Sequence, residues 1–174
     1  GPAEPVGVTP PETLNSAAWQ ARAEQLVDEC RACLNSDDGE IAYSEFITRG
    51  LKEKTILKYG LGLNPADRYE SPADWGFSGD RKVYVPAGLV IPWYLDGKIV
   101  AVNIRRFDEN PKYMVIRGSE RSIFASDNLA GKQTALFVEG EFDCILADQE
   151  IGDITGCVTL GPATGKFNLA DHAL

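Results

Sequence analysis

The chain has 174 residues, of which 44% are hydrophobic and 9% aromatic, and its formal net charge at pH 7 is −9. A chain of this length buries roughly 70% of its unfolded surface and can form one domain or two small subdomains around a core. The sequence has no apolar run near the ~18 residues of a membrane span and no apparent secretory leader, so we expect neither a membrane protein nor a disordered one, but a cytoplasmic protein.

The N-terminal part is predicted to be mainly helical. Residues 1–13 are rich in proline and are expected to form a tether, whose first Gly-Pro pair is typical of a remnant of tag removal. Apolar residues then recur at helical spacing over 19–34, with Asn15 or Ser16 as the N-cap. Two shorter helical patterns follow, and each ends at a glycine, Gly50 and Gly60.

The chain contains four cysteines, a number that suits reduced cytosolic thiols better than a disulfide framework. Cys30 and Cys33 form a CxxC pair inside the first helical pattern. A structural zinc site needs about four cysteine or histidine ligands at suitable spacing. The next cysteine is Cys144 and the only histidine is His172, so we predict two cysteines on a helix and no zinc site.

The middle of the chain is predicted to form a small antiparallel sheet after a loop over 66–82. Runs of β-forming residues over 89–94 and 98–107 are joined by Asp96-Gly97, a strong signal for a hairpin turn, and 113–116 is a third expected strand. Pro92 indicates that the first strand is irregular or at an edge. Strict alternation would place Ile99 on the same face as Ala101, Asn103 and Arg105.

Positive charge is concentrated in this middle region. The stretch from Lys98 to Lys132 holds seven basic and four acidic residues, whereas the whole chain is net negative. A local basic surface can hold a phosphate backbone because the contact is screened within about 8–10 Å at physiological salt. A solvated strand face with alternating charge explains the same pattern, and charge alone leaves both interpretations open.

The last part of the chain is predicted to form a β-α-β unit with parallel strands. Residues 134–138 are an apolar run typical of a strand buried on both faces, a helical pattern ends at Gly152, and 157–160 is a second apolar strand. Ligands of such sheets bind beyond the carboxyl ends of the strands. Glu139 and the loop 161–165 are expected to occupy that edge.

Three carboxylates lie within five residues at the end of the first of these strands. Glu139 is followed by Gly140, which allows close backbone approach, and then by Glu141 and Asp143. Oxygen ligands of this kind suit Mg²⁺, which keeps several waters and is shared with substrate phosphates. An acidic helix N-terminus that complements the helix dipole accounts for the same residues, and the pattern by itself does not separate the two.

Residues 136–143 resemble the first motif of the Toprim fold, in which a hydrophobic strand precedes Glu-Gly and an Asp follows four residues after the Glu. Primases, type IA and II topoisomerases, OLD-type nucleases and RecR-type recombination proteins share this fold. The preceding residues are similar to the DnaG-type primases of bacteria and phages. The similar segments are Arg49-Gly50-Leu51, Thr55-Ile56, Tyr59, Gly60-Leu61-Gly62, Leu89–Pro92, Gly97–Val100, Arg105 and Pro111-Lys112-Tyr113.

This resemblance implies an α+β protein of two parts: a basic N-terminal subdomain (14–132), made of a helical segment and a small antiparallel sheet, and the first portion of a Toprim α/β unit (133–174). It implies a primase that makes RNA primers on single-stranded DNA from nucleoside triphosphates, with Mg²⁺ or Mn²⁺ as cofactor. A replicative helicase, fused or separate, is a further implied partner, as in a phage, plasmid or mobile element.

The resemblance also assigns residue roles. Glu139 matches the Toprim glutamate that serves metal-assisted nucleotidyl transfer, and Asp143 matches the second acidic position near the metal. Arg105 and Lys112 match basic residues that grip template or nucleotide. Two further basic residues are added on charge alone, Arg106 and Lys132.

The family's Asp-x-Asp motif is expected on a third strand, beyond the point where this chain ends at Leu174. We therefore expect a fragment that is inactive alone as a polymerase. A module that binds single-stranded DNA or a partner protein without catalysis, and another Toprim enzyme, a topoisomerase or an OLD-type nuclease, are the alternatives.

Overall fold

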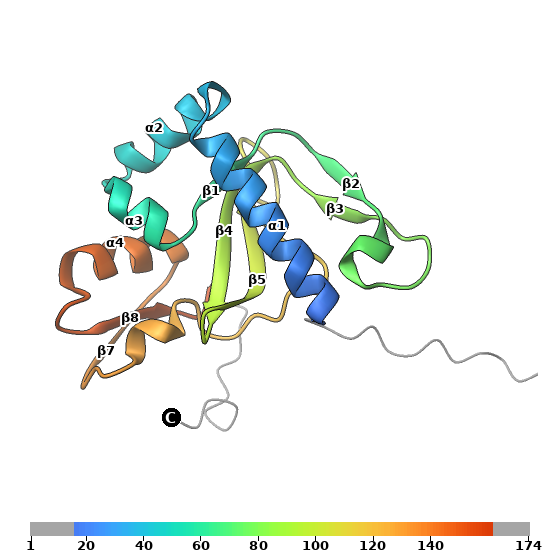
Figure 1. Cartoon of the computed structure of the whole chain (residues 1–174). Coiled ribbons are helices and arrows are strands. Elements are labelled where there is room, and N and C mark those ends of the chain that lie inside the picture. The colour runs from blue at the N-terminus through green and yellow to red at the C-terminus, as the bar shows by residue number, and fades with distance from the viewer. Residues whose placement is uncertain (1–15, 162–174) are drawn as a thin grey trace, which may run out of the picture.

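The computed structural model describes residues 16–161. Figure 1 shows a central antiparallel sheet with helices on both sides, a two-stranded arm at one end, and a β-α-β unit packed beside the sheet. The helices are α1 (Ala17–Leu34), α2 (Glu40–Thr48), α3 (Glu53–Lys58) and α4 (Glu141–Ile151), with short 3₁₀ turns η1 (Asp37–Gly39), η2 (Pro72–Trp75) and η3 (Ser126–Leu129). The strands are β1 (Gly62–Asn64), β2 (Arg68–Glu70), β3 (Val83–Val85), β4 (Gly88–Leu95), β5 (Lys98–Arg105), β6 (Tyr113–Val115), β7 (Ala135–Val138) and β8 (Gly156–Thr159). The predicted α+β class is confirmed.

The central sheet has the strand order β1-β4-β5-β6 and is covered on both faces. One face packs on α1, where Trp19 and Leu26 lie in one apolar cluster with Val102. The other face joins α2, α3 and α4 in a second cluster that includes Phe46 and Ile145. This second cluster contains residues from both sides of position 133, so the two predicted parts share one core in the described chain. Their boundary remains a prediction.

The first helix begins as its sequence predicts. Ser16 lies just before α1 with an extended backbone, and its hydroxyl oxygen accepts a hydrogen bond of 3.2 Å from the backbone N–H of Trp19. This bond satisfies one of the backbone donors that a helix start leaves unpaired. Asn15, the other candidate cap, and the proline-rich residues 1–13 lie outside the described residues. No helix within 16–161 is long and apolar enough to cross a membrane.

The β4–β5 hairpin confirms the predicted turn but not the predicted faces. Asp96 and Gly97 have φ angles of 50° and 73°, the left-handed conformations that a type I′ turn needs. The register shifts after Trp93, so that Val100 becomes the extra residue of a bulge. Ile99 therefore packs with the α1 cluster and not on the face of Ala101, as strict alternation predicted.

The strand with Pro92 is irregular but not an edge strand, because β4 lies between β1 and β5. Its short neighbour β1 pairs only with the first part of β4, up to Val90. Pro92 lies beyond that point, where β4 no longer donates backbone hydrogen bonds to β1. Proline, which has no backbone N–H, is tolerated there because no hydrogen bond between the strands is lost. The prediction had no counterpart for β1, whose three residues are too few to show a period.

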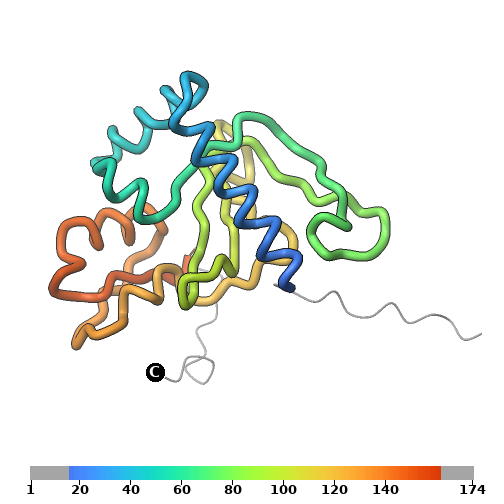
Figure 2. The backbone as a smooth tube through the Cα atoms, in the orientation of Figure 1, coloured from blue at the N-terminus to red at the C-terminus, as the bar shows by residue number. Residues whose placement is uncertain are grey.

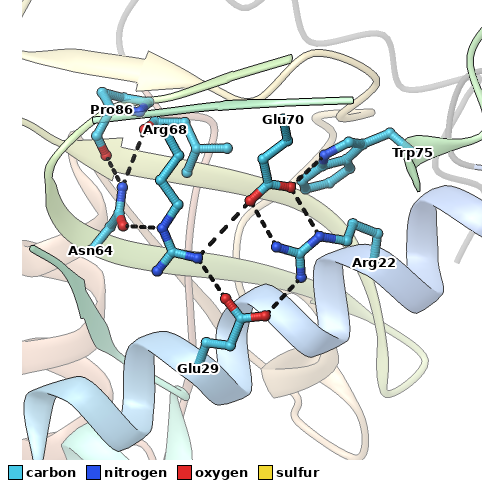
Figure 3. A network of polar contacts seen from close by, with 8 residues as sticks. Arg22, Glu29, Asn64, Arg68, Glu70, Trp75 and Pro86 are labelled. Atoms are coloured by element: carbon cyan, nitrogen blue, oxygen red, sulfur yellow. Dashed lines mark hydrogen bonds and ion pairs between the residues drawn. The ribbon is translucent and has the colours of Figure 1, made fainter. Parts of the chain in front are cut away.

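The prediction of a loop over residues 66–82 is wrong, because this segment contains the strand β2 and the turn η2. β2 pairs with β3 to form an arm that extends from one end of the sheet (Figure 2). A polar network fastens the arm to α1, as Figure 3 shows: the Arg22 guanidinium donates to both Glu70 carboxyl oxygens at 2.9 and 2.7 Å, and Arg68 donates to Glu29 at 2.5 Å. Because β2 has only three residues and is held by charged partners, it lacks the apolar alternation that marks a strand.

The C-terminal β-α-β unit is present as predicted, with β7 and β8 parallel and α4 ending at Gly152. β8 is fully buried, but β7 is only half-buried and Phe137 is 53% exposed, so the prediction of a strand buried on both faces is wrong for β7. β7 has one partner strand among the described residues. Of the predicted loop 161–165, only Gly161 lies within the described chain.

Candidate nucleic-acid and metal site

The acidic turn follows the carboxyl end of β7. Glu139 comes directly after the strand, Gly140 is the extended N-cap of α4, and Asp143 lies in the first turn of the helix. The side chains of Glu139 and Asp143 are both exposed. A Cβ atom on Gly140 would lie 3.8 Å from Asp143 Oδ2, which is an ordinary contact distance, so the Asp143 carboxyl group lies beside the glycine. The two predicted metal ligands therefore flank one glycine and face solvent.

Glu141, between them, points the opposite way. Its side chain is 3% exposed, and one of its carboxyl oxygens accepts a hydrogen bond of 2.6 Å from the side-chain amide of Asn103 on β5. The carbonyl oxygen of Asn103 is buried without a hydrogen-bond partner. This contact ties the first turn of α4 to the central sheet, two residues before the end of β5 at Arg105.

A chain of side-chain contacts connects the basic end of β5 with the acidic turn. The Arg105 guanidinium lies 3.7 Å from a Glu45 carboxyl oxygen, and the same oxygen accepts a hydrogen bond of 2.7 Å from Arg49. The Arg49 guanidinium in turn lies over the Phe142 ring, 4.5 Å from its centroid. Arg105, predicted from the resemblance, is therefore linked through α2 to the residue that precedes Asp143.

Tyr113, the first residue of β6, lies among these groups. Burial raises the pKa of its hydroxyl, and the charge of Glu141 adds to the increase, whereas the nearby Arg105 and Arg49 lower it. The hydrogen bond from Asn103 to Glu141 shows how closely the sheet end and α4 approach each other, and the charges that act on Tyr113 agree with it. The sheet and the β-α-β unit therefore meet at a polar seam. It consists of Arg49, Asn103, Arg105, Tyr113 and Glu141.

A cavity of about 430 Å³ opens beside this seam. Arg106 lies in it, 11% exposed, with an ion pair to Glu109 and a hydrogen bond of 3.4 Å to the Pro111 carbonyl oxygen. Lys112 is exposed and makes no ion pair within residues 16–161. The positive and negative charges that line the cavity are equal in number. Besides Phe107, its lining consists of three cationic side chains, Arg105, Arg106 and Lys112, and three carboxyl groups, Glu45, Asp108 and Glu109.

The structure places Lys132 away from the other predicted site residues. It lies before β7, and its ammonium group donates a hydrogen bond of 2.8 Å to the backbone carbonyl oxygen of Asp153, in the connection that leads into β8. This position is at the amino end of the parallel strands, whereas Glu139 follows the carboxyl end. Lys132 closes a loop there, and we leave it out of the proposed site.

The donor set of the acidic turn fits Mg²⁺ in kind. Mg²⁺ is commonly held by one or two carboxylates and completes its coordination with waters and substrate phosphates. Glu139 and Asp143 provide two exposed carboxyl groups for such a site. No cluster of three or more acidic, histidine or cysteine side chains that could hold a metal occurs in the described part of the chain, so these two residues do not form a closed protein cage.

Three residues of the seam were not selected from the sequence as site residues. Arg49 belongs to the Arg-Gly pair used for the resemblance, which is a signal that could have identified it. Asn103 interrupts an apolar strand, and a polar residue at a buried strand position indicates a specific partner. Glu141 could not be separated from its acidic neighbours, because sequence spacing does not show which carboxyl group turns inward.

Comparison with solved structures identifies the fold. The DnaG primase catalytic domain bound to single-stranded DNA superposes with a TM-score of 0.69 at 16% identity, over 86% of this chain and 55% of that one. The RNA polymerase domain of Mycobacterium tuberculosis DnaG gives 0.69 at 22% identity, over 90% and 60%. The zinc-binding and RNA polymerase domains of the Aquifex aeolicus primase give 0.64 at 22% identity, over 85% and 43%.

No protein-family model and no curated protein sequence matches the chain. The structural likeness therefore stands on backbone geometry: the chain has the fold of a DnaG primase catalytic core. It spans only 55% and 60% of the first two solved domains, so it corresponds to part of that core.

Proposed function

We propose that the chain is part of a DnaG-type primase, which makes RNA primers on single-stranded DNA by Mg²⁺-dependent nucleotidyl transfer. The observation that carries the proposal is the polar seam: the hydrogen bond from Asn103 to Glu141 sets the acidic turn of Glu139 and Asp143 against the basic end of β5. A primase must bring phosphates and metal-binding carboxylates together, and this fold supports that arrangement.

In this proposal the acidic turn binds the metal, and the basic residues at the cavity bind or position the phosphates. Glu139 and Asp143 would hold Mg²⁺, which neutralises phosphate charge when bound. Lys112, exposed at the cavity, would bind template or nucleotide phosphates, and Arg105 would form the cavity wall. Since Arg105 is 13% exposed and paired with Glu45, its main contribution is to set the shape and local charge of the wall. Such catalysis depends mostly on positioning and electrostatics.

The finer parts of the proposal concern partners and location. Nucleoside triphosphates would be the substrates, and a replicative helicase, fused or separate, would deliver the single-stranded template. We propose a cytoplasmic location, where thiols remain reduced. The four cysteines, all within the described residues, are free, which supports this location.

A binding module without catalysis is the second candidate, and one observation favours it. Lys112 is exposed at the cavity, where it can bind a phosphate group without any metal. A chain that binds single-stranded DNA through Lys112, but whose longer parent protein synthesises no primer, would have this second function.

Fluorescence anisotropy with a labelled single-stranded DNA across a salt series tests the binding step that both candidates share. We expect Lys112→Ala to weaken binding several-fold and to reduce the slope of log K against log salt by about 0.7, the value for one phosphate contact on a single strand. Lys98→Ala is the matched control, because this exposed lysine lies at the opposite end of β5. Unchanged affinity and slope in Lys112→Ala would exclude the cavity as the phosphate site.

A further inference from the structure

The outer face of the β2–β3 arm carries two stacked tyrosines. Tyr69 and Tyr84 are direct partners in the register of the two strands, and their rings are 5.0 Å apart between centroids with 24° between the planes. Tyr69 is 67% exposed, whereas Tyr84 is half-buried. The Tyr69 ring therefore contacts Tyr84 but is otherwise largely open to solvent.

The packing of the arm does not require these rings. The inner face of the arm provides its apolar contacts through Val83 and Val85, which belong to the α1 cluster. Its polar contacts to α1 come from Arg68 and Glu70 in the network of Figure 3. The arm is thus fixed to α1 from one side, and the tyrosines lie on the other.

The ring of Tyr84 is held in place before any ligand arrives. Its hydroxyl donates a hydrogen bond of 2.9 Å to Asp67 Oδ2, and Asp67 Oδ1 accepts one of 2.8 Å from the backbone N–H of Ala87. The fixed ring of Tyr84 in turn stacks against the ring of Tyr69. An ordered surface of this kind loses little conformational entropy when a ligand binds.

The tyrosine pair is continuous with the proposed site. Asp67, which holds Tyr84, also binds the backbone of Ala87, and the next residue, Gly88, lies so close to the Arg105 carbonyl oxygen that a Cβ atom there would overlap with it. The charge of Arg106 lowers the pKa of the Asp67 carboxyl group, after the two hydrogen bonds from Ala87 and Tyr84. Arg106 also lines the cavity with Lys112 and the exposed ring of Phe107. A ligand that lies on Tyr69 can therefore extend over Arg106 towards the phosphate site.

We propose that Tyr69, supported by Tyr84, is a stacking platform for the bases of single-stranded DNA on its path to the cavity. The inference rests on the proposed function, since it names how the same ligand is held further from the acidic turn. Proteins that hold single strands combine a basic groove with aromatic rings on which bases stack, and such stacking is tolerant of sequence. The arm supplies the ring, and the exposed Lys112 supplies the charge.

The test separates base stacking from phosphate binding by using two labelled strands of equal length, oligothymidine and an abasic strand with the same backbone. For wild type we expect tighter binding to oligothymidine. Tyr69→Ala should weaken that binding by about 5- to 150-fold, the range for loss of one stacked base, and leave the abasic strand unaffected. Tyr69→Phe, which keeps the ring, should bind as wild type does, and the salt slope should be unchanged in both variants.

Ile154→Ala is the matched control, because Ile154 is 70% exposed and lies in the connection between α4 and β8. Thermal melting by circular dichroism checks that each variant is folded. Equal binding of oligothymidine by Tyr69→Ala and wild type, or an equal loss for both strands, overturns the platform while the phosphate site stands. A wild-type chain that binds neither strand overturns both the platform and the proposed template binding.

Discussion

Asn103 donates a 2.6 Å hydrogen bond to Glu141 inside the protein, although the two residues are 38 positions apart in sequence. Asn103 lies in the central sheet and Glu141 in the first turn of α4, so this one bond joins the two structural units on which the proposed chemistry depends. The predicted site residues are its close neighbours in sequence. Arg105 lies two residues after Asn103, and Glu139 and Asp143 lie two residues before and after Glu141. The pair therefore acts as a positioning contact for the site.

Removing the donor should destabilise the protein. In Asn103→Ala, the buried carboxyl group of Glu141 loses its hydrogen bond, and an unsatisfied buried polar group costs about 1–3 kcal/mol. In Glu141→Gln, by contrast, the new amide keeps an acceptor for Asn103 and offers a donor to the Asn103 carbonyl oxygen, which has no partner now. We expect unchanged or higher stability. Urea unfolding measures both, and a loss of stability in Glu141→Gln as large as in Asn103→Ala would contradict this account.

Glu139→Gln should abolish Mg²⁺-dependent primer synthesis from ribonucleotides when this chain is tested as part of a complete primase core, because an amide is a far weaker ligand for a hard cation than a carboxylate. The control is Glu150→Gln, an exposed acidic residue in the last turn of α4. Binding of single-stranded DNA at low salt should remain in both variants. Primer synthesis at the wild-type rate by Glu139→Gln would refute the catalytic role.

Asp148 should be important for docking α4 onto α3. Its side chain is 5% exposed and accepts hydrogen bonds from Lys58 at 2.5 Å and from the Tyr59 hydroxyl at 2.8 Å. Asp148→Ala removes the acceptor of the buried Tyr59 hydroxyl, whereas Lys58, which is 56% exposed, can be hydrated instead, so we expect a loss of about 1–3 kcal/mol in the free energy of unfolding. Lys52→Ala, which removes an exposed pair with Glu150, should cost less than 1 kcal/mol. Similar losses in the two variants would show that burial of Asp148 is unimportant.

Alkaline pH should destabilise the protein partly through Cys30. Burial raises the pKa of this thiol to about 12, above the roughly 8.5 of an unfolded cysteine. The unfolded chain therefore loses the proton first, and the contribution to stability, complete below about pH 8.5, is lost as pH rises towards 12. The slope from one such group is at most about 1.4 kcal/mol per pH unit.

Cys30→Ala should flatten this dependence without removing it, since burial also raises the pKa of Cys144 and Tyr59. Urea unfolding at pH 8, 9 and 10 measures the slope. Cys33→Ala is the control, because Cys33 is only half-buried in the same helix. An identical slope in Cys30→Ala and wild type would show that the buried thiol does not contribute.

The sequence predicted the features that depend on neighbouring residues. The Asp96-Gly97 turn, the cap at Ser16 and the β-α-β unit after Gln133 are all local patterns, because a turn type, a cap or a strand period depends on a few adjacent residues. The same holds for the Glu-Gly pair that marks the acidic turn. The bulge at Val100 was invisible because it arises from the pairing of two strands, and one strand alone does not show it.

Composition alone thus said less about the fold and the site than the motifs did, and the motifs said less about the site than the packing did. Length, charge and motifs were enough for an α+β fold with an acidic turn and a basic stretch. Only the tertiary structure decided that Glu141 turns inward to Asn103, that Arg105 and Arg106 are covered by carboxyl groups while Lys112 is exposed, and that Lys132 lies at the other end of β7. It also stacked Tyr69 on Tyr84 on the outer face of the β2–β3 arm. These relations join residues far apart in the chain, and their partners are chosen by the free energy of burying and pairing polar groups in one particular packed core.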